Sequence, residues 1–263
     1  MHYSILYSCV SHVGKIRRIN QDNFVCDGRY MEMDGEGFEF PLCGIKSSKC
    51  PSVFGIFDGM GGEECGEIAS YIAAQNAAAI KTGKDVISTL LQFCQKANTD
   101  ICGYANENEI SAMGTTAAIL AFTDDRVTLC NIGDSKIFRF CDGALEQISK
   151  DHVAVAPFGV KPPLSQNLGI PPTELVIDPY LAQGAYHDGD VYLICSDGLT
   201  DMVTTEEIAG VLEAGPVEEG IMELLEKALS NGGRDNITII LCKIERESGW
   251  LFKRKRQNQK KEA

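Results

Sequence analysis

The sequence predicts an α+β fold in which two mostly antiparallel sheets pack face to face and helices cover their outer faces. The order of the expected elements is the first reason. Strands are followed by two helices, a strand meander, two more helices and a last strand. The meander is the second reason, because its Asp-Asp and Asp-Gly turns favour hairpins and therefore antiparallel neighbours. The 263 residues suit a single catalytic-sized domain.

The first part of the chain combines strands with two helices. Strand-like apolar patterns occupy residues 3–10, 24–26 and 53–57. Residues 27–52 are polar and rich in glycine, so we expect an irregular insertion loop there. Apolar residues then recur at helical spacing from about 68 to 80 and from 85 to 106, and these two helices should pack side by side.

The second part begins with the meander. Its four strands are expected at 115–122, 126–132, 136–140 and 144–149, and later strands at 191–196 and 236–244. Helical patterns follow at about 205–213 and 217–230. Residues 151–189 are rich in proline, and we expect loops with short strands there.

Composition limits the classes of function. The net charge is -13, and an acidic body repels phosphate backbones, which argues against a nucleic-acid partner. The chain shows neither a membrane-length apolar run nor a leader-like start, so we expect a cytoplasmic protein. Residues 247–263 form a basic tail that we expect to be disordered. Contact of this tail with a membrane or a partner is the less favoured alternative.

The eleven cysteines are scattered and form no C-x-x-C pair. In a reducing compartment such residues are mostly small buried hydrophobes. Cys43 and Cys50 could be half of a zinc site, but no second pair accompanies them. We therefore interpret them as structural thiols.

Five aspartates lie at the ends of apolar strands, several of them beside glycine: Asp22, Asp58, Asp134, Asp197 and Asp235. Turn chemistry explains any one of them, since Asp-Gly is a favourable turn. Five are harder to explain in this way, because carboxylates gathered at one sheet edge repel one another unless cations lie between them.

Oxygen ligands without clustered His or Cys select Mg²⁺ or Mn²⁺. The four histidines lack zinc-type spacing, which disfavours a zinc hydrolase. Two such cations can share a water molecule and activate it for in-line attack on phosphorus. Arg17 lies five residues before Asp22 and could hold phosphate oxygens with its guanidinium fork, although a solvated basic turn is the alternative.

Seven short motifs, taken together and in order, resemble the metal-dependent serine/threonine phosphatases of the protein phosphatase 2C family in its short bacterial form. The resemblance spans about residues 3–244. The motifs are R-x-x-N-x-D (17–22), D-G-M-G-G (58–62), G-T-T (114–116), G-D-S (133–135), K-D-H (150–152), S-D-G-L-x-D (196–201) and R-D-N-x-T (234–238).

The resemblance implies a four-layer α-β-β-α sandwich with a di-metal site at one edge. Asp58 would bridge both ions, and the Gly59 carbonyl would bind one of them. Asp197 and Asp235 would bind the other ion, so these two and Asp58 are the implied catalytic residues. Asp22 would complete the site directly or through water.

Further roles follow from the same resemblance. Arg17 would hold the substrate phosphate, and Asp134 and Asp201 would form a weaker third metal site together with Asp197. The implied domain covers residues 1–246, and residues 151–189 correspond to a mobile flap in the family.

The implied reaction is hydrolysis of phosphoserine and phosphothreonine on proteins by a water molecule that bridges the metals. The partners would be targets of a Ser/Thr kinase, and the kinase itself is a further candidate. The alternative is a weak or inactive member that binds phosphoproteins as a scaffold.

Two positions depart from the family pattern. Many members have Asn-Glu-Asp where this chain has Asn20-Gln21-Asp22, and the neutral Gln21 should bind a cation more weakly. Eukaryotic members often have His in the glycine turn, where this chain has Met60. The proton for the leaving oxygen must then come from metal-bound water or from a residue that the sequence does not identify.

Overall fold

The computed structural model describes residues 2–33, 35, 37–38, 40–60, 65–83, 85–157, 159 and 161–247. Its first sheet has the spatial order β3 (Leu42–Ser47), β1 (Tyr3–His12), β12 (Ile237–Arg246), β11 (Val191–Cys195), β8 (Lys136–Cys141) and β9 (Ala144–Gln147). The second has the order β10 (Tyr180–Ala185), β7 (Arg126–Ile132), β6 (Ala117–Phe122), β4 (Ser52–Met60) and β2 (Asp22–Cys26), with the short β5 (Gly114–Thr115) beside β4.

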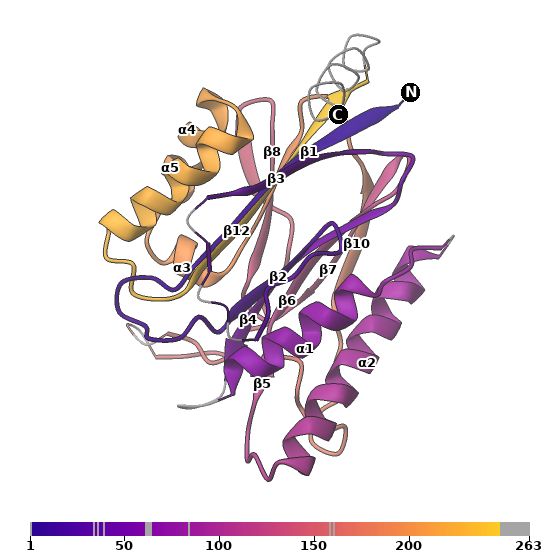
Figure 1. Ribbon diagram of the computed structural model, residues 1–263, viewed down its shortest axis with the longest axis vertical. Coiled ribbons are helices and arrows are strands. Elements are labelled where there is room, and N and C mark those ends of the chain that lie inside the picture. Colours follow the sequence, from indigo (N-terminus) through magenta and orange to yellow (C-terminus); the bar gives the residue numbers. More distant parts are fainter. Residues whose placement is uncertain are drawn as a thin grey trace, which may run out of the picture.

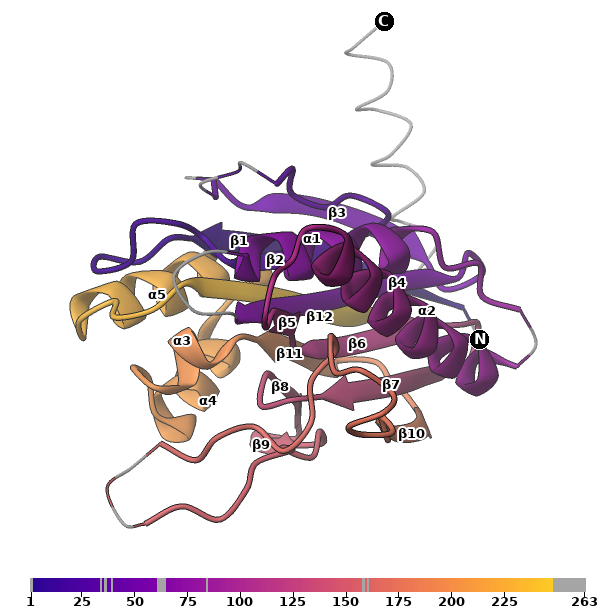
Figure 2. The same ribbon diagram turned by 90° about the horizontal axis from the view of Figure 1, so that it is seen from below.

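Helices cover the outer face of each sheet, and the described strand pairs are all antiparallel. The second sheet carries α1 (Gly66–Ala78) and α2 (Val86–Glu107), and the first carries α4 (Thr205–Ala214) and α5 (Val217–Ser230). A one-turn helix, α3 (Asp197–Thr200), follows β11. The two views in Figure 1 and Figure 2 show the resulting layers. The predicted α-β-β-α sandwich is confirmed.

Three buried apolar layers hold these elements together. Phe54, Tyr192 and Ile240 belong to the layer between the sheets. In the layer beneath the first helix pair, alanines recur every four residues on α1, as at Ala69 and Ala73, and are fully buried. Small side chains on this face let α1 lie close to the sheet.

The prediction of an irregular loop over residues 27–52 is wrong in part, because β3 lies inside it and pairs with β1. An edge strand needs only one neighbour for its hydrogen bonds, so polar residues can face the solvent. Gly44 looked like a breaker in the sequence. A Cβ at this position would collide with the ring of Tyr7, so glycine is what allows Tyr7 to pack against β3.

The remaining predicted strands and helices are confirmed within a few residues of their expected ends. The expectation that the cysteines are mostly buried holds for six of eleven, whereas Cys43 and Cys50 are exposed. Residues 248–263 of the predicted disordered tail lie outside the described residues.

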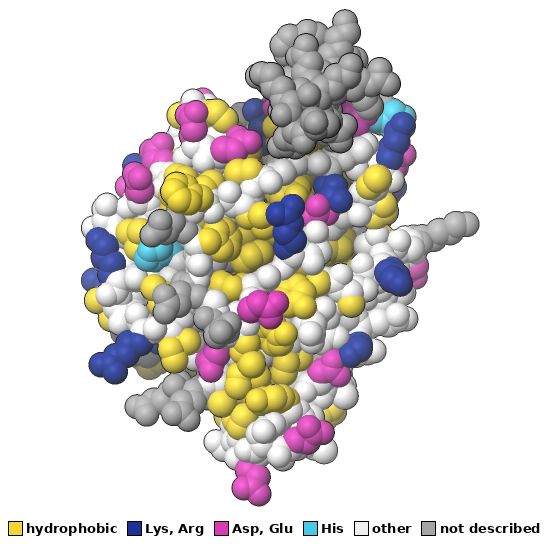
Figure 3. Space-filling model, in the orientation of Figure 1, with side chains coloured by type: hydrophobic (Ala, Val, Ile, Leu, Met, Phe, Trp, Pro, Cys, Tyr) yellow, Lys and Arg dark blue, Asp and Glu magenta, His cyan; other side chains and the backbone are white. Residues whose placement is uncertain are grey.

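On the face drawn in the space-filling view, acidic and basic side chains are interspersed around a band of hydrophobic side chains (Figure 3). Within the described part of the chain, no helix is long and apolar enough to cross a membrane.

Candidate active site

The predicted acidic residues meet at one edge of the sandwich, where strands of both sheets end. Asp22 opens β2 and faces Asp58 of β4 in register. The other sheet contributes Asp197, two residues after β11, and Asp235, two residues before β12. Asp134 lies between β7 and β8. Asp58, Asp134, Asp197 and Asp235 line a cavity of about 290 Å³ that Arg17 also lines, whereas Asp22 is buried and does not line it.

Asn236 and Ser196 join the two sheets at this edge. The Asn236 Oδ1 accepts a hydrogen bond from the backbone N–H of Gln21 at 2.8 Å. Its Nδ2 donates to the carbonyl oxygens of Val13 and Ile19 at 2.8 and 3.0 Å. Ser196 donates to Asp22 Oδ2 at 2.7 Å and accepts from the backbone N–H of Thr238 at 3.0 Å. The non-acidic residues of two motifs therefore hold the acidic ones in place.

The G-T-T and G-D-S motifs position Asp58 in the same way. Thr116 Oγ1 accepts from the Asp58 backbone N–H at 3.0 Å, and its own N–H donates to the Asp58 carbonyl at 2.9 Å. The Thr115 hydroxyl donates to the same carbonyl at 3.0 Å. The hydroxyls of Thr116 and Ser135 lie 2.7 Å apart, which ties Asp58 to the loop that carries Asp134.

Gly59, the residue after Asp58, lies where a side chain would not fit. A Cβ at Gly59 would collide with the carbonyl oxygen of Gly66 on α1, and the Gly59 N–H donates to the Gln21 carbonyl at 3.1 Å. Only glycine permits this close approach of three chain segments. The backbone of Gln21 thus contacts Gly59, whereas its side chain contacts α1, where Nε2 donates a hydrogen bond to Glu67 Oε2 at 3.2 Å.

Burial and mutual repulsion perturb the acidic groups. Burial raises the pKa of Asp22 to about 7, and the charges of Asp197 and Asp235 act in the same direction. Burial, followed by the charge of Asp22, raises the pKa of Asp58 well above its usual range. Burial likewise raises the pKa of Asp134 and of Asp197. The protein thus confines carboxylates where their charged forms are unfavourable without a cation.

Two basic side chains reach into the acidic cluster. Arg17 Nη2 lies 2.8 Å from Asp235 Oδ2, and this hydrogen bond raises the pKa of Arg17. Lys161 Nζ binds Asp197 Oδ2 and lies 3.1 Å from Asp201 Oδ2. Burial opposes the charge of Lys161, but the bonds to Asp197 and Asp201 raise its pKa overall. Lys161 therefore joins the expected third metal site to residues 151–189.

Lys161 was not predicted from the sequence. A signal was available, because Lys161 is the single Lys or Arg in residues 151–189, the segment that the resemblance matches to the family's flap. As the side chains stand, no three His, Cys, Asp or Glu residues in the described ranges are placed to hold a metal ion. Asp197, Asp201 and Asp235 are bound to Lys161 and Arg17 instead.

The sequence profile of the protein phosphatase 2C family matches residues 43–231, which is more than half of the chain. The chain belongs to this family. Its relatives include the serine/threonine protein phosphatase PstP of Mycobacterium tuberculosis, which is 32% identical over 203 residues. That match covers 72% of this chain and 40% of the relative, so the chain spans well under half of the mycobacterial protein.

Two further matches cover nine-tenths or more of the protein that is compared. The serine/threonine phosphatase stp of Listeria innocua is 28% identical over 248 residues, 87% of this chain and 91% of the relative. The catalytic domain of PstP, solved in complex with two manganese ions, has a TM-score of 0.75 and 27% identity. This structural match covers 92% of this chain and 100% of the PstP catalytic domain.

The residues of this chain fit Mn²⁺ or Mg²⁺. Every acidic donor in the cleft is a hard oxygen ligand, the type that both ions prefer. Asp22 and Asp58 are the most informative pair, since neither has a basic partner among the residues described and both have raised pKa values. A bound divalent cation would offset both the burial and the mutual repulsion that raise these pKa values.

Proposed function

We propose that this chain hydrolyses phosphoserine and phosphothreonine esters on proteins with the help of two divalent cations, Mn²⁺ or Mg²⁺. One observation carries the proposal. Four aspartates from both sheets face one cleft, and their negative charge exceeds what Arg17 and Lys161 supply. A guanidinium at the rim of the same cleft supplies donors for phosphate oxygens.

Each residue has a separate task in this proposal. Asp58, with the Gly59 carbonyl, and Asp197, Asp235 and Asp22 would hold the ions. When bound, the ions supply Lewis-acid activation of water and of the phosphoryl group. Cation binding replaces contacts that exist in the structure, so Asp235 and Asp197 must exchange Arg17 and Lys161 for the ions. The freed Arg17 guanidinium is then available to orient the phosphate.

A third ion is part of the proposal, at Asp134, Asp197 and Asp201. The Lys161 ammonium already binds two of these carboxylates, so it competes with that ion. The leaving oxygen needs a proton, and the described residues that line the cleft include Met60, at the end of β4, but no histidine. Water in the open cleft is the proposed donor.

We propose that the substrates are proteins phosphorylated by a Ser/Thr kinase, and that the kinase itself is a further candidate substrate. Such substrates would give the chain a role in signalling. The relatives, which are serine/threonine phosphatases, support the enzyme class. The cytoplasmic location and the domain limits of 1–246 stay predictions.

The test is phosphate release from a phosphothreonine peptide with and without millimolar Mn²⁺. We expect wild-type release to depend on the metal and to vanish in Asp58→Asn and Asp235→Asn. Asp142→Asn is the matched control, because Asp142 is exposed in the β8–β9 turn at a positive φ that asparagine adopts readily. A folded wild type that binds Mn²⁺ yet releases no phosphate would favour the phosphoprotein-binding scaffold.

A further inference from the structure

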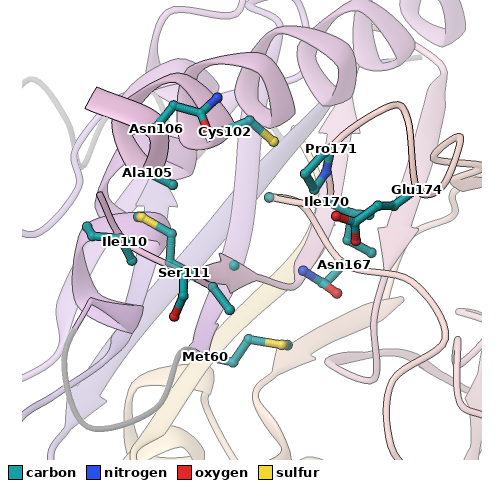
Figure 4. A pocket seen from close by; sticks show the side chains of 14 residues that line it. Met60, Cys102, Ala105, Asn106, Ile110, Ser111, Asn167, Ile170, Pro171 and Glu174 are labelled. Carbon is teal, nitrogen blue, oxygen red and sulfur yellow. The ribbon is translucent and has the colours of Figure 1, made fainter. Parts of the chain in front are cut away.

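A second pocket of about 390 Å³ lies beside the acidic cleft, and Met60 lines both cavities. One wall is the C-terminal end of α2, with Cys102, Ala105 and Asn106. Residues 110–114 and 167–174 supply the others (Figure 4). The cleft and the pocket therefore share Met60 as a boundary residue, which a substrate segment that spans both would contact.

The pocket is held in shape by buried hydrogen bonds. Asn98 of α2 is buried, and its Oδ1 accepts from the backbone N–H groups of Gly169 and Ile170 at 2.7 and 3.1 Å. Its Nδ2 donates to the Ile170 carbonyl at 2.9 Å. One asparagine therefore fixes the 169–170 wall to the helix. Gly169 has a φ of +103°, and a Cβ there would collide with the Met113 carbonyl, so this wall requires glycine.

The same backbone supports the cleft and the pocket. Thr115 exchanges two backbone hydrogen bonds with Leu168, at 3.0 and 2.9 Å, and its hydroxyl holds the Asp58 carbonyl. The distance from the acidic residues to the pocket is thereby set by rigid elements. A preformed cavity at a fixed distance from a reacting group is suited to recognise a neighbouring residue of a substrate.

The chemistry of the pocket differs from that of the cleft. Its lining is mainly apolar, with Ile110, Ile170 and Pro171, whereas the cleft is lined by carboxylates. Glu174 is the charged residue among those that line the pocket, and it is exposed at the rim. This combination matches a large apolar side chain inside the pocket, with a basic side chain next to it near Glu174.

We propose that this pocket is a docking subsite for the substrate segment next to the phosphorylated residue, and that it selects a large apolar side chain flanked by a basic one. The inference rests on the proposed phosphatase function and deepens it. The pocket thereby assigns a sequence preference to the chain that the acidic cleft alone does not provide.

The test compares peptides with a substrate too small to reach the pocket. A leucine is moved through the positions on both sides of phosphothreonine in an alanine peptide, and p-nitrophenyl phosphate is the small substrate. Wild type should prefer one leucine position by about tenfold in kcat/KM, the gain expected for burying one leucine side chain. Arginine beside that leucine should increase the preference, and glutamate there should reduce it.

Two variants separate docking from catalysis. Ala112 and Glu174 are exposed at the pocket, so substitutions there should leave the fold intact. Ala112→Trp should fill the pocket and abolish the leucine preference through KM, whereas Ala112→Ser should retain it. Glu174→Lys should shift the preference from arginine to glutamate. None of these variants should change hydrolysis of p-nitrophenyl phosphate.

The outcomes are distinct. The inference is overturned if wild type hydrolyses all peptides equally, if Ala112→Trp keeps the leucine preference, or if it slows both substrates alike. The last result would mean that the pocket controls the cleft itself, as a small effector site would. Inactivity of the metal-loaded wild type towards peptides and p-nitrophenyl phosphate would instead overturn the proposed function.

Discussion

Asp22 and Asp190 are buried to the same degree, with 2% and 3% of their surface exposed, but their surroundings are opposite. Asp190 accepts two hydrogen bonds from Arg139 Nη2, at 3.0 and 2.8 Å, and one from the backbone N–H of His187 at 2.7 Å. Asp22 accepts a hydroxyl hydrogen bond from Ser196 and lies opposite Asp58, a second carboxylate, which is half-buried and lines the cleft.

The difference separates structural from functional acids. The charge of Asp190 is balanced within the protein, so this carboxylate joins β8 to the turn before β11 and needs no ligand. The charges of Asp22 and Asp58 have no counter-charge from Lys or Arg in the part of the chain that is described. Burial of an aspartate is therefore a weak indicator of function, whereas burial without a cation is a strong one.

The largest expected effect concerns Asp58. Asp58→Asn should lower metal-dependent phosphate release by about 10³-fold or more, because cations at such a site supply several kcal/mol to the transition state. Asp190→Asn should retain wild-type activity per folded molecule. The measurement is the initial rate of phosphate release at saturating Mn²⁺. Comparable losses in both variants would remove the distinction between the two aspartates.

The reverse pattern is expected for stability. Asp190→Asn leaves Arg139 without its charge partner and should lower the free energy of unfolding by about 3 kcal/mol. This is the low end for a broken buried pair, since 28% of the Arg139 side chain is exposed. Urea unfolding of the metal-free protein measures it. Asp58→Asn should not be destabilised in the same assay, and a loss as large as that of Asp190→Asn would contradict the account.

The third prediction concerns pH. The pKa of Asp22 is raised from 3.8 to about 7 in the folded protein, so its contribution to stability is present below pH 4 and is lost as the pH rises towards 7. In the metal-free protein, Asp22→Asn should therefore be more stable than wild type at pH 8, by about 2 kcal/mol. This is less than the full shift would give, because the cleft is open to water.

At pH 4 the advantage of Asp22→Asn should disappear, since the wild-type carboxyl is then protonated. Thermal unfolding of both proteins in chelator across pH 4–8 provides the test. An advantage that does not vary with pH would mean that Asp22 is not charged and unpaired in the folded state.

The smallest effect is expected for Lys161. Lys161→Gln removes the cation that binds Asp197 and Asp201, so Mn²⁺ should bind the third site about two- to fivefold more tightly. That range corresponds to an exposed ion pair of up to ~1 kcal/mol, and the side chain of Lys161 is 55% exposed. Calorimetric titration with Mn²⁺ measures it, and Lys161→Arg should leave the affinity near wild type. Unchanged affinity in Lys161→Gln would show that the lysine does not compete.

The sequence was sufficient to predict the layers of the fold and the residues of the acidic cluster. Strand ends near Asp58, Asp197 and Asp235 could be predicted, because an apolar run ends at or just before the first two and another begins just after the third, and the topology brings these ends together. Edge strand β3 was not predictable from its residues, since its stability comes from pairing with β1. Lys161 was missed because its partner lies 36 residues away, across a proline-rich segment without periodicity.

The pocket beside the cleft also could not be predicted from the sequence. It depends on the buried Asn98 of the amphipathic helix α2. The side chain of Asn98 binds a backbone segment about 70 residues later in the chain. Such a contact leaves no local pattern. It becomes visible only when α2 and residues 167–174 are placed together in three dimensions.

The central claim is that the unpaired aspartates of the cleft are a site for divalent cations. Calorimetric titration of Mn²⁺ into wild type, Asp58→Asn and Asp190→Asn tests it most directly. We predict that Asp190→Asn binds the two ions of the proposed di-metal site with the same affinity as wild type. Asp58→Asn should lose this binding while remaining folded. Equal binding by Asp58→Asn and wild type would contradict the account.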